Sequence, residues 1–239
     1  MIKPELSSSP ARTKLIPLRD KSVGFNDNLS TTVNNLGPVI GIDFDNTIAD
    51  YDELFVIVAN ELKLLNQTLP KNKAEVKVAL LKQTNGDQLW QKLQGQVYGK
   101  YMKQARLMPD VGQFFMECRR QQACVYIVSH KTCFGHFDEA KINLRDASKS
   151  WMQQNNFFKA TEFALKESHV FFETTRDEKI ERIKQLNCHY FIDDLTVVLN
   201  DSNFPEATQK ILYSPNNKVL EGDFKTLTCW NDIQNAIFS

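Results

Sequence analysis

Short runs of apolar residues recur along the chain and alternate with longer segments of helical spacing. Five such runs cover residues 38–45, 124–130, 169–173, 189–194 and 210–214, and residues 226–230 are a candidate sixth. The runs are rich in Val, Ile, Phe or Tyr and lack strict polar alternation, which is typical of strands buried on both faces. We therefore expect these segments to form the interior strands of a sheet.

Helical patterns lie between these predicted strands. They cover residues 110–121, 138–158 and 175–187. The first begins at a start signal, Pro109–Asp110, and the third repeats apolar residues at Ile180, Ile183 and Leu186. Because strands alternate with helices, we predict an α/β fold: a Rossmann-like parallel sheet with helices on both faces.

Residues 51–109 break this alternation, because they contain no convincing strand. Helical patterns cover residues 51–67, 73–83 and 87–106. A crossover between neighbouring parallel strands needs only about a dozen residues, so we predict an all-helical lobe inserted after the first strand. The core would then comprise residues 38–50 and 110–239. Residues 1–37 are rich in Ser, Asn, Thr and Pro and are predicted to be a flexible extension.

The predicted lobe is basic, although the whole chain is neutral with 29 basic and 29 acidic residues. Residues 51–109 hold nine Lys or Arg and five Asp or Glu, a net charge of +4. Most of these lysines are expected on solvated helix faces; a few facing the cleft would attract an anionic substrate. Neutral overall charge and the lack of an aromatic–basic repeat argue against a nucleic-acid partner.

Composition indicates an ordinary globular chain, with 42% hydrophobic and 24% charged residues. No apolar run approaches the roughly 20 residues of a membrane span, so no membrane partner is expected. The five cysteines form no CxxC pair and are expected to be reduced, which favours a cytoplasmic location. An organelle transit peptide stays an alternative, although Glu5 and Asp20 interrupt it. No pattern indicates an oligomeric state.

Polar side chains gather where the predicted strands end. They are Asp43, Asp45, Ser129, His130, Asp193 and Asp194, with Lys179 early in the helix before the fourth strand. In an open parallel sheet, ligands bind outside the carboxyl ends of the strands. Asp43 and Asp45 are two residues apart and point to the same side of their strand. Two carboxylates so close repel each other, so they need a cation, a shared proton or a wet surface.

A hard divalent cation suits this group of carboxylates, because Mg²⁺ prefers oxygen ligands and keeps several waters. A proton shared within a carboxylate pair would also relieve the repulsion. Ser129 and Lys179 add a hydroxyl and a positive charge, which favours a phosphate beside the metal. No His or Cys pattern fits zinc.

These segments resemble the motifs of the haloacid dehalogenase-like phosphohydrolases. "DFDNT" matches their DxDxT motif, and "VYIVS" followed by "HKT" is similar to their second motif. Lys179 is placed for the third motif and "YFIDD" for the fourth. Lys184 and Lys131 are alternatives for the third. The resemblance covers roughly residues 39 to 200, and it implies an inserted helical cap that closes over small substrates.

The resemblance also implies a role for each matching residue. Asp43 would be the nucleophile that forms an aspartyl-phosphate. Asp45 would protonate the leaving oxygen and then activate water. Thr47 would help to fix the loop, while Ser129 and Lys179 would hold phosphate oxygens.

A second set of implied roles concerns the metal and the substrate. Mg²⁺ would be held by Asp43, the main-chain carbonyl of Asp45 and Asp194, with Asp193 in contact with the ion or behind its ligands. His130 and Lys131, which follow Ser129, are further candidates for substrate contact. The family's dehalogenases lack the second Asp of DxDxT, so Asp45 favours phosphoryl chemistry.

The function predicted from the sequence is a Mg²⁺-dependent phosphatase that hydrolyses a small phosphorylated metabolite through an aspartyl-phosphate. A phosphotransferase or phosphomutase of the same fold is one alternative. A non-catalytic binding protein that retains the fold is another. The identity of the substrate has no signature in the sequence.

Overall fold

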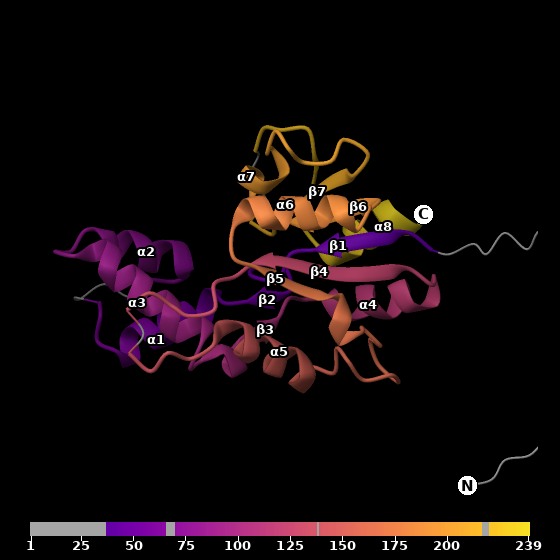
Figure 1. The fold of residues 1–239 in the computed structure, drawn as a ribbon. Coiled ribbons are helices and arrows are strands. Elements are labelled where there is room, and N and C mark those ends of the chain that lie inside the picture. The colour runs from indigo at the N-terminus through magenta and orange to yellow at the C-terminus, as the bar shows by residue number, and fades with distance from the viewer. Residues whose placement is uncertain (1–36, 66–69, 138, 217–219) are drawn as a thin grey trace, which may run out of the picture. The chain divides into compact units, whose positions relative to one another are not determined.

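The computed structural model describes residues 37–65, 70–137, 139–216 and 220–239 (Figure 1). The extension predicted over residues 1–37 lies outside these residues, apart from Gly37.

A six-stranded parallel sheet forms the centre of the fold, in the order β5-β4-β1-β6-β7-β8. Its strands are β1 (Val39–Ile42), β4 (Cys124–His130), β5 (Val170–Glu173), β6 (Tyr190–Asp193), β7 (Gln209–Tyr213) and β8 (Lys225–Leu227). Ile40 of β1 pairs with Val125 on one side and with Tyr190 on the other. The central position of β1, between β4 and β6, places its carboxyl end between theirs.

Helices cover both faces of the sheet, as predicted (Figure 1). Alternate strand residues point to opposite faces: Ile42 and Ile127 join one apolar cluster with Trp151 and Trp230, whereas Phe191 joins a second cluster. The first cluster lies beneath α4, α5 and α8, and the second beneath α6 and α7. These helices are α4 (Val111–Arg120), α5 (Leu144–Gln154), α6 (Arg176–Gln185), α7 (Thr196–Leu199) and α8 (Trp230–Phe238).

Gly41 makes room in β1 for the second cluster. A Cβ atom at this position would lie 2.5 Å from Cδ2 of Phe191 and 2.9 Å from Sγ of Cys188. Real side chains do not approach so closely, so the ring of Phe191 requires glycine at this position. The ring also lies under the ammonium group of Lys179, 5.5 Å from its centroid.

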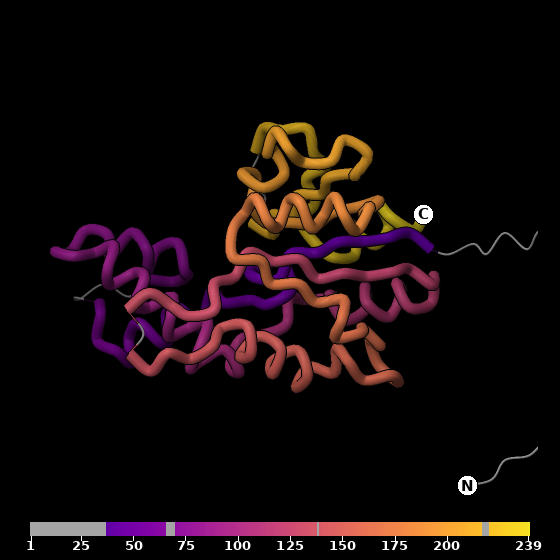
Figure 2. The backbone as a smooth tube through the Cα atoms, viewed as in Figure 1, coloured from indigo at the N-terminus to yellow at the C-terminus, as the bar shows by residue number. Residues whose placement is uncertain are grey.

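A helical segment follows β1, and the tube in Figure 2 traces it from the loop after β1 to α4. It contains β2 (Ala49–Asp50), α1 (Asp52–Glu61), α2 (Lys73–Leu81), α3 (Gly86–Tyr98), the 3-10 turn η1 (Met102–Gln104) and β3 (Arg106–Leu107). The prediction that residues 51–109 contain no strand is wrong, because β3 pairs antiparallel with β2. Two residues are too short a run to give a hydrophobic pattern. The division into core and cap at residues 50/51 and 109/110 stays a prediction.

Several element boundaries differ from those predicted. The helix predicted from residue 138 begins at Leu144, because Asn143 caps it: the Asn143 side chain accepts a hydrogen bond from the amide of Arg145. The strand predicted over residues 226–230 ends at Leu227, and Trp230 begins α8. A second 3-10 turn, η2 (Glu167–His169), precedes β5. None of the helices in the described ranges is long and apolar enough to cross a membrane.

Candidate active site

The carboxyl ends of β1, β4 and β6 bring most of the predicted site residues together. Asp43 follows β1 directly, and its amide donates to the carbonyl of Ile192 in β6 at 2.9 Å. Ser129 is buried near the end of β4, and Asp193 ends β6. Asp43, Ser129 and Asp194 all line one cleft. The structure therefore brings these residues to one edge of the sheet, as the strand-end argument from the sequence predicted.

A tight turn follows Asp43 and presents Asp45 to the cleft. The amides of Ile48 and Ala49 donate to the carbonyl of Phe44, and Asn46 has a φ of 58°. Asn is one of the few residues that adopt this left-handed conformation readily. The Thr47 hydroxyl is buried and has no hydrogen-bond partner among the described residues. The role of Thr47 in fixing the loop stays a prediction.

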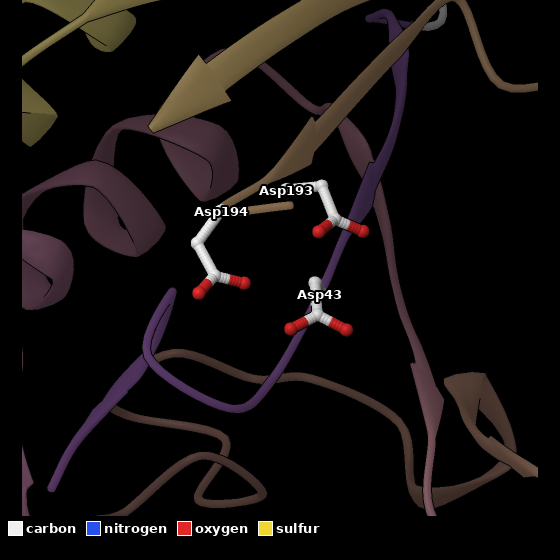
Figure 3. Close-up of side chains that lie close together, drawn as sticks. All are labelled: Asp43, Asp193 and Asp194. Atoms are coloured by element: carbon white, nitrogen blue, oxygen red, sulfur yellow. The ribbon is translucent and has the colours of Figure 1, made fainter. Parts of the chain in front are cut away.

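Three carboxylates lie close together in Figure 3: those of Asp43 and Asp193, which are buried, and that of Asp194, which is partly buried. Each offers an oxygen within 4.8 Å of the others. Burial and the charges of Asp193 and Asp43 raise the pKa of Asp194 well above its ordinary value. Burial also raises the pKa of Asp193 to about 6, although the charge of Lys179 opposes this shift. The three carboxylates therefore concentrate negative charge in a small volume, which favours the binding of a cation.

The donor set fits a hard divalent cation. Oδ1 of Asp194 is buried and accepts no hydrogen bond within the described part of the chain, which suits an oxygen that ligates a cation. Asp193 is less available, because its two oxygens accept from the amide of Leu195 at 2.9 Å and from Lys179 at 2.6 Å. The carboxylate of Asp45 is not part of this group. The sequence analysis predicted that Asp45 binds the metal through its main-chain carbonyl, and that stays a prediction. Oxygen ligands of this kind are those that Mg²⁺ prefers.

Lys179 is the cation that the protein itself supplies to these carboxylates. It lies in the first turn of α6, whose start is set by a capping box between Thr175 and Glu178. Its ammonium group donates to Asp43 and Asp193, at 2.6 Å each. Burial opposes its charge, but the two carboxylates outweigh burial and raise the pKa of Lys179. Lys184, the alternative on the same helix, is exposed.

Asp45 is held by a separate pair of donors. Nζ of Lys131 lies 2.8 Å from Oδ2 and 3.0 Å from Oδ1 of Asp45, and the Tyr51 hydroxyl donates to Oδ1 at 2.6 Å. Lys131 and Tyr51 are almost completely buried. Both carboxylate oxygens of Asp45 therefore accept hydrogen bonds from buried donors.

His130 lies at the edge of the same cleft. It is exposed, and its Nε2 lies 2.9 Å from the carbonyl oxygen of Thr174. Its predicted contact with substrate stays a prediction.

The cleft has a volume of about 1190 Å³ and is lined from two sides. The strand ends supply the carboxylates, and helices α2 and α3 supply polar and aromatic side chains that include Lys73, Lys77 and Tyr98. This volume is slightly above the range of about 300–1,000 Å³ that is usual for small-molecule sites.

Sequence reasoning did not identify Tyr51 or single out Lys73. Lys73 donates to Oδ1 of Asn46 at 2.9 Å, although 27 residues separate them. Neither residue has a periodic or motif signal, because both reach the site only through the fold. The excess of lysines in residues 51–109 was the one indication.

No protein-family model matches the chain, and no curated protein sequence matches it significantly. Solved structures do resemble it. A haloacid dehalogenase (HAD) superfamily hydrolase of Bacillus subtilis bound to magnesium is 13% identical, with a TM-score of 0.54 over 85% of this chain and 99% of that one. A HAD-family hydrolase of Deinococcus radiodurans with bound phosphate and sodium is 11% identical, with a TM-score of 0.51 over 85% and 96%.

A dehalogenase is 9% identical, with a TM-score of 0.52 over 85% of this chain and 98% of that one. At these identities the likeness concerns the fold. The chain has the HAD-like fold: an α/β, Rossmann-like parallel sheet flanked by helices.

Proposed function

We propose that this chain, whose fold is that of the HAD-superfamily hydrolases, is a Mg²⁺-dependent phosphomonoester hydrolase. The observation that carries the proposal is the separation of two carboxylates on one turn. Asp43 belongs to the buried acidic group with Lys179, whereas Asp45 is held apart by Lys131 and Tyr51. Two carboxylates in different environments suit two different tasks.

Asp43 is the nucleophile in this proposal. One of its oxygens attacks phosphorus, the bond from phosphorus to the leaving oxygen breaks, and Asp45 gives a proton to that oxygen. Water then attacks the phosphorus of the aspartyl-phosphate, and Asp45 takes a proton from that water. The bond from phosphorus to the Asp43 oxygen breaks, which releases phosphate and restores Asp43.

Lys131 connects the two roles of Asp45. In the structure Lys131 forms an ion pair with Asp45, with Nζ 2.8 Å from Oδ2. Lys131 lines the cleft, as Ser129 does, and in this proposal its ammonium group turns to a phosphoryl oxygen of a bound substrate. That movement would leave Asp45 able to hold the proton that the leaving oxygen needs. Ser129 and Lys179 would hold the remaining phosphoryl oxygens.

Asp43 and Asp194 would hold Mg²⁺, together with the main-chain carbonyl of Asp45, and Asp193 would orient the group through Lys179. When bound, the ion supplies positive charge that stabilises the charge of the transferring phosphoryl group. The magnesium and phosphate in the two related structures support this assignment by analogy.

Residues 51–109 act as a cap in this proposal, because α2 and α3 line the cleft opposite the strand ends. A roofed cleft suits a small phosphorylated metabolite and excludes water from the reacting atoms. A cytoplasmic location stays a prediction.

A phosphate-release screen with Mg²⁺ tests the proposal, over sugar phosphates, nucleotides and phosphorylated acids. Asp43→Asn protein serves as the blank. We expect release of inorganic phosphate from at least one ester by the natural chain and none by the variant. Equal release by both proteins would remove Asp43 as nucleophile. Disappearance of an ester without free phosphate would indicate a phosphotransferase instead, and inertness towards every ester would overturn the hydrolase.

A further inference from the structure

Two lysines of α2 face the cleft from the side opposite the strand ends. Lys73 and Lys77 both line the cleft and lie one helical turn apart, so their side chains share one face of α2.

The other lysine and arginine side chains that line the cleft have carboxylate partners. Lys179 pairs with Asp43 and Asp193, Lys131 pairs with Asp45, and Arg176 pairs with Asp201.

Lys73 differs from them. Its ammonium donates to two neutral oxygens, Oδ1 of Asn46 at 2.9 Å and the hydroxyl of Tyr98 at 3.1 Å. Across the described ranges, no carboxylate oxygen lies within 4.0 Å of Nζ in Lys73 or Lys77. Both lysines therefore lack a counter-charge at contact distance.

Aromatic rings support both ammonium groups. Nζ of Lys73 lies 5.0 Å from the ring centroid of Phe55 and 5.7 Å from that of Tyr98, and Nζ of Lys77 lies 5.6 Å from that of Trp90. The rings of Phe55 and Trp90 are themselves stacked, with centroids 5.0 Å apart. An aromatic face attracts a cation without neutralising it, so the positive charge stays available to a ligand.

The position of Lys73 identifies which part of a substrate it meets. Its partner Asn46 directly follows Asp45, the residue assigned to the leaving oxygen. Asp43, Ser129 and Lys179 are the residues assigned to the transferred phosphoryl group, and the hydrogen bonds of the Lys73 ammonium go to Asn46 and Tyr98 instead. A group bound to Lys73 and Lys77 is therefore carried by the leaving part of the substrate.

We propose that Lys73 and Lys77 bind a second anionic group, a carboxylate or a phosphoryl group, on the leaving part of the substrate. This inference rests on the proposed hydrolase and narrows its substrate class to small phosphomonoesters that carry another anion.

Matched pairs of esters test the inference. Glycerol 3-phosphate and 3-phosphoglycerate differ by a carboxylate, and fructose 6-phosphate and fructose 1,6-bisphosphate differ by a phosphoryl group. Binding is measured by calorimetry with Mg²⁺ in Asp43→Asn protein, which does not turn the esters over, and phosphate release is measured with Asp43 intact.

The anionic member of at least one pair should bind about tenfold tighter or more, because a hydrogen bond to a charged group is worth at least that factor. The pair of esters that shows this difference in affinity identifies whether the second anion is a carboxylate or a phosphoryl group. Adding Lys73→Met should remove the preference, and adding Lys77→Met should reduce it. Adding Lys82→Met, which removes the exposed lysine that caps the carboxyl end of α2 and does not line the cleft, should leave the preference intact.

Equal affinity within both pairs, or no binding at all, would overturn the inference. The inference would also be overturned if Lys73→Met lowered the affinity for both esters of a pair equally, because Lys73 would then bind the transferred phosphoryl group that the two esters share. Should Lys73→Met fail to fold, the Lys77→Met result decides. Selective binding without phosphate release by protein that retains Asp43 would instead contradict the hydrolase and leave the anion site standing.

Discussion

The hydroxyl of Tyr51 donates a 2.6 Å hydrogen bond to Oδ1 of Asp45 from a fully buried position. Burial and the charge of Asp45 raise the pKa of Tyr51 well above its ordinary value of 10.0. The hydroxyl therefore stays protonated at every pH at which a phosphatase would be assayed. Together with Lys131, it fixes the carboxylate that we assign to proton transfer.

Tyr51→Phe should lower kcat by about tenfold or more, because a hydrogen bond to a charged group contributes about 1.5–3 kcal/mol. Steady-state phosphate release measures this. Tyr101→Phe is a matched control, because Tyr101 donates to Glu61 and does not line the cleft. Unchanged kcat in Tyr51→Phe protein would show that this bond does not position Asp45 for the reaction.

Asp45→Asn should slow esters of poor leaving groups far more than p-nitrophenyl phosphate. A sugar or glycerol oxygen needs a proton as its bond to phosphorus breaks, whereas nitrophenolate leaves without one. The ratio of single-turnover rates for the two ester types measures the effect. A uniform loss across both types would assign Asp45 to binding rather than to proton transfer.

Lys179→Met should destabilise the protein by about 3–5 kcal/mol, because it leaves two buried carboxylates without their cation. Lys184→Met removes an exposed lysine of the same helix and should change stability by less than about 0.5 kcal/mol. Denaturant unfolding without metal compares the two. Phosphate binding should also be lost only in the first variant. The reverse order would assign the third motif to Lys184.

Mg²⁺ should raise the free energy of unfolding, because it relieves the repulsion among Asp43, Asp193 and Asp194. A site saturated at 100 times its dissociation constant adds about 2.7 kcal/mol. Thermal unfolding with and without Mg²⁺ measures this stabilisation. Asp194→Asn should remove most of it, whereas Asp87→Asn, at an exposed residue of α3, should not. A chelator should stop phosphate release, and added Mg²⁺ should restore it. Turnover that persists with chelator would exclude the metal from the reaction.

The hydrophobic pattern predicted the sheet well, because its interior strands have no polar face to confuse the assignment. The range predicted for β4, residues 124–130, is the observed strand. The pattern failed where local chemistry decides the structure. Asn143 sets the start of α5, and the β2–β3 pair is too short to leave a periodic signal.

The candidate site was predictable as far as it depends on strand ends. Asp43, Ser129 and Asp193 follow from the rule that parallel strands present their carboxyl ends at one edge. Tyr51 and Lys73 could not be found in this way, because their partners come from turns and helices whose relative placement is a property of the packed fold. The sequence indicated positive charge near the cleft but not which lysine carries it there.

Phe44, the residue between Asp43 and Asp45, is anchored in the opposite direction. Its ring meets Trp151 and Phe172 edge-on, with centroids 5.5 and 5.9 Å away, and Nζ of Lys131 lies 5.5 Å from its centroid. The aromatic contacts of Phe44 therefore hold the turn in place from its apolar side. The positions of both carboxylates depend on this packing, although the ring of Phe44 is not assigned to substrate contact. Substitutions at Phe44 or Trp151 would therefore disturb the reaction while leaving every polar group of the site in the sequence.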